Sequence, residues 1–324
     1  MKALLCREWA SFDHLKIEEI DAPVAGPDEV IIDVKAVGLN FFDTLIVEKK
    51  YQYQPEFPFS PGAEVAGVIG AVGKNVTGFA EGDRVMAYVK FNGAREQLAV
   101  AANDVTLIPQ NVSFEVAAGL LVTYGTTYHA LKDRARLKPG ETLAVLGASG
   151  GVGQAAVELG KVMGARVIAC ASSDEKLAFC KELGADELLN YSEKDLKTEL
   201  KRLTDGKGAD VIYDPVGGDF SEAAVRATAW NGRFLVVGFA AGKIPKIPLN
   251  LVLLKGMSLV GVFWGDHIVR ENATHITNIT TLANWCADGK IAPHIYKTWP
   301  LDEAVDAIGA IARREVRGKV ILTV

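Results

Sequence analysis

The chain has 324 residues, and its 35 basic and 40 acidic side chains give a net charge of −5. At roughly 150 residues per domain, this length predicts two domains that each bury a core. Hydrophobic residues make up 49% of the chain, which is typical of a globular protein and excludes a disordered acidic polypeptide. The charge offers no basic surface for nucleic acid, and no uncharged apolar run of about 18 residues is present to span a membrane.

Four cysteines are scattered along the chain: Cys6, Cys170, Cys180 and Cys286. No two of them form a Cys-x-x-Cys pair, so the sequence supports neither a disulfide framework nor a sulfur-ligated structural zinc ion. The N-terminal segment lacks the apolar stretch of a signal peptide, and we therefore expect a cytoplasmic location. Glycine is frequent, with 32 residues, which predicts many tight turns or close approaches of the backbone to a ligand.

Residues 1 to 120 alternate short apolar runs with glycine and proline. Three of these runs are 29–37, 64–70 and 83–89. Short strands separated by frequent turn signals predict a compact, mostly β domain.

After Pro139-Gly140 the pattern changes to continuous apolar runs that alternate with helical stretches. The runs are 142–146, 166–171, 210–214, 233–238 and 258–263. Such runs are typical of parallel strands that are covered on both faces. One helix is expected through Met163, and another from Ser173 or Asp174 to Leu183, with Gly184 as its C-cap. The alternation predicts a doubly wound parallel sheet.

From residue 267 onward we expect helices near 268–287 and 301–311 and a last strand over 319–322. This tail does not resemble a third domain, and we expect it to complete the first. The predicted fold class is α/β, with one domain at 1–120 plus 267–324 and a second at 121–266.

The strongest local signal is the glycine-rich segment Gly147–Gly153, directly after the first strand of the second domain. In a Gly-x-Gly-x-x-Gly turn, small residues let the backbone approach a pyrophosphate, toward which the next helix directs its N-terminal amides. Here the pattern is Ala148-x-Gly150-x-x-Gly153. The position between a buried strand and a helix predicts a dinucleotide site, and the alternative is a purely structural turn.

The end of the second strand bears on which dinucleotide binds. A carboxylate about 20 residues after the loop would bind the ribose 2′-hydroxyl of NAD. Positions 171–173 are instead Ala-Ser-Ser, and Lys176, which follows, suits a 2′-phosphate. The pattern favours NADPH over NADH. The alternative is that Lys176 is a solvated lysine and Asp174 simply caps the helix.

Seven multi-residue segments occur in the order and at the spacing of a known family. They are Asn40–Thr44, Pro61–Gly67, Gly82–Val85, Ala148–Gly153, Lys181–Asp186, Asn190-Tyr191 and Gly318–Val320. In these segments the chain resembles, from end to end, the quinone oxidoreductase (zeta-crystallin-like) branch of the medium-chain dehydrogenases/reductases. The resemblance implies a mostly β, GroES-like catalytic domain plus a Rossmann domain that binds NADPH.

The resemblance also implies a set of residues around NADPH. They are Asn40 and Thr126 at the nicotinamide end, Gly150, Gly151 and Val152 at the pyrophosphate, Ser172, Lys176 and Tyr191 around the 2′-phosphate and adenosine, and Arg314 as a helper. Gly238, Phe239, Phe263 and Trp264 would lie beside the nicotinamide. Packing in the core or at a dimer interface explains these aromatic side chains equally well.

Related alcohol dehydrogenases hold a catalytic zinc ion through cysteine and through the histidine of a Gly-His-Glu motif. Here the triplet is Gly62-Ala63-Glu64, and the segment 37–40 has no cysteine. Among the five histidines, at positions 14, 129, 267, 275 and 294, we find none paired with a second ligand at a helical metal-binding spacing. His129 follows Tyr128 near the cofactor segment, but a structural role is favoured, and no metal is predicted.

Without a Lewis acid, a conjugated acceptor such as a quinone or an enone is easier to reduce than a simple ketone, because it disperses the developing charge. We therefore expect hydride transfer from the nicotinamide C4 to such an acceptor, followed by protonation. Tyr51, Tyr53 and Tyr128 are the candidate proton donors or orienting groups, and water is an equal alternative. An unperturbed phenol has a pKa of about 10.

Three functions follow. The favoured one is an NADPH-dependent reductase of quinones or enones. The second is a zinc-free reductase of other activated alkenes, such as enoyl thioesters. The third is a non-catalytic NADPH-binding protein with a structural or RNA-binding role, which the acidic charge disfavours. Segment 258–263 resembles the one through which this family pairs its Rossmann sheets, so a homodimer is expected, with a small molecule as substrate and no nucleic-acid or membrane partner.

Overall fold

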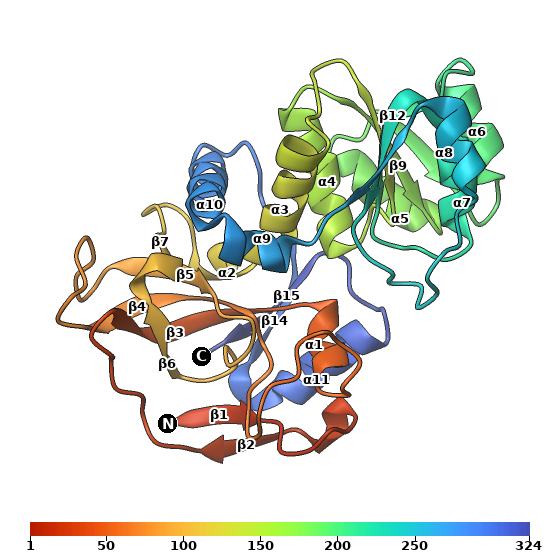
Figure 1. The fold of residues 1–324 in the computed structure, drawn as a ribbon. Coiled ribbons are helices and arrows are strands. Elements are labelled where there is room, and N and C mark those ends of the chain that lie inside the picture. Colours follow the sequence, from red (N-terminus) through yellow and green to blue (C-terminus); the bar gives the residue numbers. More distant parts are fainter. The chain divides into compact units, whose positions relative to one another are not determined.

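The computed structural model describes Met1–Val324 and divides into two compact units (Figure 1). The first comprises Met1–Val122 and Asn272–Val324, and we call it the β-rich unit. The second is Thr123–Glu271, the parallel-sheet unit. The division expected from the sequence lies at residues 120 and 267.

The β-rich unit is built on one mixed sheet with strand order β14-β15-β3-β4-β5-β7, and β6 pairs with β3. Its strands are β3 (Glu29–Leu39), β4 (Glu64–Val72), β5 (Arg84–Tyr88), β6 (Gln97–Ala101), β7 (Val105–Leu107), β14 (Ile295–Pro300) and β15 (Lys319–Thr323). A separate hairpin joins β1 (Lys2–Leu5) to β2 (Lys16–Glu19). Because β15 runs antiparallel to β3, with Val320 opposite Leu39, the C-terminal strand completes the sheet of the N-terminal segment.

Four helices belong to the same unit as this sheet. They are α1 (Phe41–Ile46), α2 (Phe114–Ala118), α10 (Asn272–Ala287) and α11 (Ala304–Ala312), with 3-10 turns at Phe12–His14, Ala102–Asp104 and Leu301–Glu303. The apolar positions of α11 recur at helical spacing: Ala304, Ala307, Ile308 and Ile311 all join the core of the unit. This packing ties the C-terminal segment to the sheet.

The parallel-sheet unit holds a six-stranded, entirely parallel sheet in the order β10-β9-β8-β11-β12-β13. The strands are β8 (Thr142–Leu146), β9 (Arg166–Ala171), β10 (Glu187–Asn190), β11 (Ala209–Asp214), β12 (Thr228–Val236) and β13 (Ser258–Gly261). The order reverses between β8 and β11, and ligands of such sheets bind where the carboxyl ends of the strands meet this reversal.

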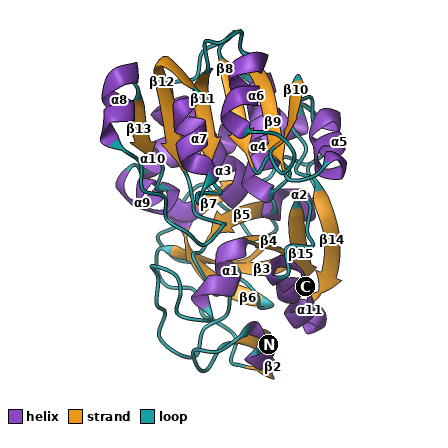
Figure 2. Cartoon of the chain, turned by 90° about the vertical axis from the view of Figure 1, so that its right-hand side faces the viewer, coloured by secondary structure: helices purple, strands orange, loops and turns teal.

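Helices lie on both faces of this sheet (Figure 2). They are α3 (Leu121–Tyr128), which continues as a π-helical turn (His129–Arg134), α4 (Gly151–Val162), α5 (Asp174–Glu182), α6 (Leu196–Leu203), α7 (Phe220–Arg226), α8 (Leu249–Lys255) and α9 (Trp264–Arg270). The strands are buried from end to end where helices cover them, as in β9, where five of six residues are buried. The doubly wound parallel sheet predicted from the sequence is confirmed.

Two sequence-based expectations need correction. The single helix expected over 268–287 is two helices, α9 and α10, because Glu271 leaves the helical conformation with φ −132° and ψ 45°. The last strand of the parallel sheet ends at Gly261 rather than at residue 263, because Phe263 already caps α9. Strands β10 and β14 were not expected.

No helix in the structure combines the length and the apolar character needed to cross a membrane.

Candidate functional site

The glycine-rich turn follows β8 at the carboxyl edge of the parallel sheet. Gly147 has a φ of +59°, and Gly150 is the N-cap of α4 and offers no side chain to its first amides. A Cβ atom on Gly153 would lie 2.2 Å from the carbonyl oxygen of Gly147, so glycine is required there for the packing of helix on strand. The sequence-based assignment of this segment to a strand–turn–helix is confirmed.

Gly150 differs from Gly153 in what its small size achieves. A Cβ atom on Gly150 would meet only the Gly147 oxygen, at 3.4 Å, so the polypeptide itself leaves room for a side chain. The residue is exposed. The uncovered amides at the start of α4 and this open space together fit an anionic group such as a pyrophosphate.

Three predicted residues meet at the end of β9. The ammonium group of Lys176 donates a hydrogen bond to the Ser172 hydroxyl over 3.0 Å, and the Tyr191 hydroxyl is hydrogen-bonded to the same serine. Ser173 caps α5 by accepting a hydrogen bond from the Lys176 backbone amide. Asp174, the alternative capping residue, accepts instead from the Asn190 amide over 3.0 Å.

Tyr191 is suited to hydrogen-bond donation. Burial is the main cause that raises its pKa to about 12, so the phenol keeps its proton at neutral pH. Its ring packs against Phe220, with centroids 4.4 Å apart. The cluster of Ser172, Lys176 and Tyr191 therefore offers two hydroxyl groups and one cation at the strand end where the sequence predicted a 2′-phosphate.

Helix α3 is fixed to the glycine turn by a residue that sequence reasoning missed. The hydroxyl of Thr127 lies 3.3 Å from the Val152 carbonyl oxygen, to which it donates, and 2.8 Å from the Tyr213 hydroxyl. Thr126, the predicted nicotinamide contact, is its half-buried neighbour. The sequence signal for this residue was the pair of consecutive threonines. Thr127 makes the packing contacts, and Thr126 is left as the predicted contact to the nicotinamide.

The predicted residues after β12 and β13 differ in exposure. Phe239 is 40% and Phe263 50% exposed, whereas Trp264 is buried at 6%. Gly238 is half-buried. Trp264 is therefore a packing residue of α9, and the two phenylalanines present free ring surface.

In the β-rich unit, Asn40 belongs to a buried polar network. Its side-chain amide donates to Glu64 Oε1 over 2.9 Å, and its carbonyl oxygen accepts from Lys319 Nζ over 2.8 Å. Lys319 also contacts Glu64 Oε1 at 2.5 Å and the Leu39 carbonyl at 3.1 Å. The other oxygen of Glu64 accepts from the Val122 amide over 2.7 Å. The network holds Asn40 in one orientation.

A second carboxylate lies beside this network. Asp43 is 1% exposed and accepts hydrogen bonds from the amides of Asn40, over 2.7 Å, and Gly62, over 2.9 Å. Burial raises its pKa to about 7, against the opposing effect of these amides and of Lys319. Sequence reasoning missed Asp43, Glu64 and Lys319 as a group, although each lies in a segment that carried the family resemblance.

Two of the candidate tyrosines, Tyr51 and Tyr53, lie in the β-rich unit, and their rings meet edge to face with centroids 5.6 Å apart. Tyr51 also stacks on Phe42 at 5.1 Å. Burial raises the pKa of Tyr51 to about 12, with further contributions from Tyr53 and Asp43. Burial also raises the pKa of Tyr88, and the nearby Tyr53 and Tyr51 add to this shift. Tyr88 is therefore a third tyrosine of the same group, which the sequence analysis did not name.

The remaining predicted residues lie elsewhere. Tyr128 is in the parallel-sheet unit, where it is 7% exposed, Lys132 Nζ lies 5.2 Å from its ring centroid, and burial raises its pKa. Arg314 belongs to the β-rich unit and follows α11 with a φ of +60°. Because burial raises the pKa of Tyr51 and of Tyr128, these two phenols are suited to donate a hydrogen bond rather than to release a proton readily.

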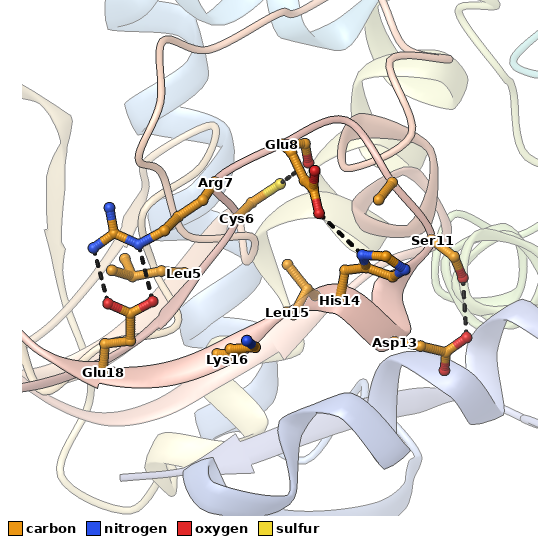
Figure 3. Close-up of a pocket in the computed structure, with 11 residues that line it drawn as sticks. Leu5, Cys6, Arg7, Glu8, Ser11, Asp13, His14, Leu15, Lys16 and Glu18 are labelled. Carbon is orange, nitrogen blue, oxygen red and sulfur yellow. Dashed lines mark hydrogen bonds and ion pairs between the residues drawn. The ribbon is translucent and has the colours of Figure 1, made fainter.

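A pocket of about 420 Å³ lies at the N-terminal segment of the β-rich unit (Figure 3). Its walls carry an ion pair of Arg7 with Glu18 at 2.8 Å and a hydrogen-bonded pair of His14 with Glu8 at 3.0 Å. None of the predicted cofactor or catalytic residues lines it.

The histidines correct one sequence-based interpretation. His129 and His267 each stand four residues before a carboxylate, and His129 Nδ1 lies 2.9 Å from Asp133 Oδ2. His267 Nδ1 lies 3.6 Å from Glu271 Oε2. The view that no histidine pairs with a second ligand at helical spacing is therefore wrong for these two.

Two family models match the chain. Residues 26–127 match the alcohol dehydrogenase GroES-like domain, and residues 151–278 match a family described as zinc-binding dehydrogenase. The chain is 38% identical over 323 residues to quinone oxidoreductase-like protein 2 of Rattus norvegicus, which covers 99% of this chain and 92% of that protein. The chain belongs to the quinone oxidoreductase family of medium-chain dehydrogenases/reductases.

Solved structures of the family extend this result. The quinone oxidoreductase of Escherichia coli, solved as a complex with NADPH, is 26% identical, with a TM-score of 0.92 and full coverage of both chains. The enoyl reductase CurK is also 26% identical, with a TM-score of 0.89 over 99% of each chain. The predicted pair of domains, GroES-like and Rossmann, is confirmed by these matches. The lack of a catalytic zinc ion in this family member stays a prediction that rests on residues 37–40 and 62–64.

Proposed function

We propose that this chain is an NADPH-dependent oxidoreductase that reduces quinones or related conjugated carbonyl compounds without a catalytic metal ion. The observation that carries the proposal is the cluster of Ser172, Lys176 and Tyr191 at the end of β9, one strand away from the glycine turn. A 2′-phosphate needs a cation and hydrogen-bond donors, and these three side chains provide both. The family membership and the NADPH complex of a relative support the same cofactor.

Within this proposal, the residues of the parallel-sheet unit bind the cofactor. Gly150, Gly151 and Val152 present the α4 amides to the pyrophosphate. Thr126, Gly238, Phe239, Phe263 and Trp264 are assigned to the nicotinamide end, the exposed rings of Phe239 and Phe263 as contacts and Trp264 as their support. Bound NADPH supplies the hydride.

Residues of the β-rich unit, together with Tyr128 of the parallel-sheet unit, complete the assignment. Asn40, which its bonds to Glu64, Lys319 and the Gly38 carbonyl oxygen hold in place, is assigned to the nicotinamide end, and Arg314 is assigned as a helper. Tyr51, Tyr53 and Tyr128 are assigned to orient the acceptor oxygen by hydrogen-bond donation. Burial raises the pKa of Tyr51 and of Tyr128 and keeps these two phenols protonated, so a water molecule is the equal candidate for delivering the proton.

The second candidate function is reduction of another activated alkene, such as an enoyl thioester. The observation that favours it is the similarity to an enoyl reductase, at an identity equal to that of the quinone oxidoreductase. The same cofactor residues serve both reactions, so the acceptor decides between them.

The cofactor assignment is tested by the dissociation constants of NADPH and NADH for the wild type and Lys176→Ala. Loss of one charge-assisted contact predicts a roughly 10- to 100-fold weaker binding of NADPH and unchanged binding of NADH. Lys181→Ala is the matched control, because Lys181 lies on the same helix and donates to the Ala185 carbonyl instead. Equal or tighter binding of NADH to the wild type would overturn the assignment.

The reaction is tested by oxidation of NADPH with 1,2-naphthoquinone, an enone and crotonyl-CoA in parallel. The proposal predicts a higher kcat/KM for the quinone or the enone than for crotonyl-CoA. A preference for crotonyl-CoA supports the second function. No turnover with any acceptor, despite tight NADPH binding, indicates a non-catalytic NADPH-binding protein.

We also propose a homodimer that forms through β13. This strand is the edge of the parallel sheet, and Leu259 on it is 37% exposed. An edge strand with unpaired backbone groups pairs readily with a second copy. Light scattering coupled to size exclusion tests this, and a monomer at micromolar concentration contradicts it.

A further inference from the structure

Two buried histidines of the parallel-sheet unit lie face to face. His129 begins the π-helical turn after α3, and His267 lies on α9; both helices can be followed in Figure 1. Each residue is 5% exposed, and the ring centroids are 3.8 Å apart with 19° between the planes. Two imidazole groups from segments far apart in the sequence are thus brought to one point.

Carboxylates accompany both rings. Asp133 Oδ2 lies 2.9 Å from His129 Nδ1, and the ligand-type atoms of His129, Asp133 and His267 all lie within 4.8 Å of one another. Glu271 Oε2 lies 3.6 Å from His267 Nδ1 and is 63% exposed. The group therefore contains two imidazole rings and two carboxylates, which are the nitrogen and oxygen ligands that zinc-type cations prefer.

His267 is the residue that the protein itself does not satisfy. Its side chain is 3% exposed, and neither ring nitrogen has a hydrogen-bond partner. A buried polar group without a partner costs on the order of 1–3 kcal/mol of stability. A bound ligand that pairs with His267 would remove this cost. Both histidines line a pocket of about 450 Å³, together with Arg134, Asp266 and Glu271, which gives such a ligand a route of entry.

We propose that His129, Asp133 and His267 form a binding site for one zinc-type divalent cation, with Glu271 as the fourth ligand. Nothing in the proposed reductase function uses these residues. The site also differs from the zinc position of the related alcohol dehydrogenases, which corresponds to residues 37–40 and 62–64 of the β-rich unit. The two carboxylates balance the charge of the cation.

Occupation requires a modest rearrangement. Tetrahedral zinc ligands lie about 3.3 Å from one another, so the atoms must close by somewhat more than 1 Å. Parallel stacked rings do not direct their nitrogen lone pairs to one point, and one ring must turn out of the stack. Burial lowers the pKa of His129, which keeps the imidazole neutral and ready to bind. A neutral imidazole binds the cation through its unprotonated nitrogen and keeps its single proton on the other ring nitrogen, so no net proton is released from the two rings.

The test uses the untagged full-length protein after removal of metal ions by a chelator and dialysis. Zn²⁺ is titrated by calorimetry, and Co²⁺ by its visible absorption, whose intensity reports four- or five-coordinate geometry. The wild type is expected to bind one ion per chain, with an absorption spectrum of low coordination number. His267→Gln and Asp133→Asn are each expected to weaken binding at least tenfold.

The matched control is His14→Gln, because His14 and Glu8 form an exposed histidine–carboxylate pair at 3.0 Å without a third ligand (Figure 3). This variant should bind the ion as the wild type does. Absence of stoichiometric binding in the wild type, or unchanged affinity in both site variants, overturns the proposal. Circular dichroism of each metal-free variant establishes that it is folded, and the partly exposed Asp133→Asn supplies the comparison if His267→Gln is not.

Discussion

Two lysines of this protein occupy opposite environments. Lys319 is 2% exposed and is bonded to Glu64, Asn40 and the Leu39 carbonyl. Lys176 is half-buried near the carboxyl end of β9, where it donates a hydrogen bond to the Ser172 hydroxyl. The buried lysine is committed to groups of its own chain, whereas the other retains donor capacity for an external anion. The difference separates a side chain that builds a site from one that is free to bind a ligand.

The largest effect is expected from Lys319→Met. Removal of one partner leaves Glu64 buried and uncompensated, which typically costs about 3–5 kcal/mol. The free energy of unfolding from urea denaturation should fall by that amount. Lys319→Met with Glu64→Gln should recover a large part of it. A loss below 1 kcal/mol in the single variant would show that the pair is not needed.

The next effect concerns Asp43 and pH. Its pKa in the folded chain is raised to about 7, so the folded state holds a proton that the unfolded state has already lost. The contribution of Asp43 to stability is therefore full below about pH 4 and is lost as the pH rises to about 7.

The measurement is the difference in unfolding free energy between the wild type and Asp43→Asn. Between pH 4 and pH 7 the wild type should lose on the order of 1–4 kcal/mol of unfolding free energy relative to Asp43→Asn. Above pH 7 the difference between the two proteins should stay constant. A difference that is constant, or that rises with pH, contradicts the assignment of a raised pKa.

A pair of glycine substitutions separates packing from binding. Gly153→Ala places a Cβ atom 2.2 Å from the Gly147 oxygen and should lower the unfolding free energy by about 1–3 kcal/mol. Gly150→Ala, which meets only one atom at 3.4 Å, should lower the unfolding free energy by less than about 1 kcal/mol, the cost of a poorer N-cap, and weaken NADPH binding several-fold. Urea denaturation and calorimetry give the two values. If the two variants were equally stable, Gly153 would not be a packing residue in contrast to Gly150.

The smallest effect is expected from Lys161→Met. Lys161 forms an ion pair with Asp186 at 2.7 Å, but 34% of its side chain is exposed. Solvent screens such a pair, so the unfolding free energy should change by less than about 1 kcal/mol. If Lys161→Met lowered the unfolding free energy as much as Lys319→Met does, burial would not explain the difference between Lys161 and Lys319.

The fold and the cofactor end of the site were predictable because their signals are local. The glycine turn, the Ala-Ser-Ser end of β9 and Lys176 lie within about 30 residues of one another, in the order that a strand–turn–helix–strand unit requires. Tyr191 was placed beside them only through the family resemblance, because β10, the strand that brings it next to Ser172, was not expected from the sequence.

The buried groups were not predictable in the same way. Glu64 and Lys319 are 255 residues apart, and only the pairing of β15 with β3 brings them together. His129 and His267 meet through the packing of a π-helical turn on α9, and neither the turn nor the break at Glu271 has a clear sequence signal. Contacts that depend on packing between distant segments need the three-dimensional structure.

The pairing of the C-terminal strand β15 with β3 affects the order in which the two units are able to fold during synthesis. A ribosome completes Thr123–Glu271 before it makes Lys319, so the parallel-sheet unit is able to fold while the sheet of the β-rich unit still lacks β14 and β15. During that interval Glu64 has no cation opposite it, and the carboxylate favours solvent over the core. We therefore expect the sheet around β3 to reach its native state only after β15 has been made.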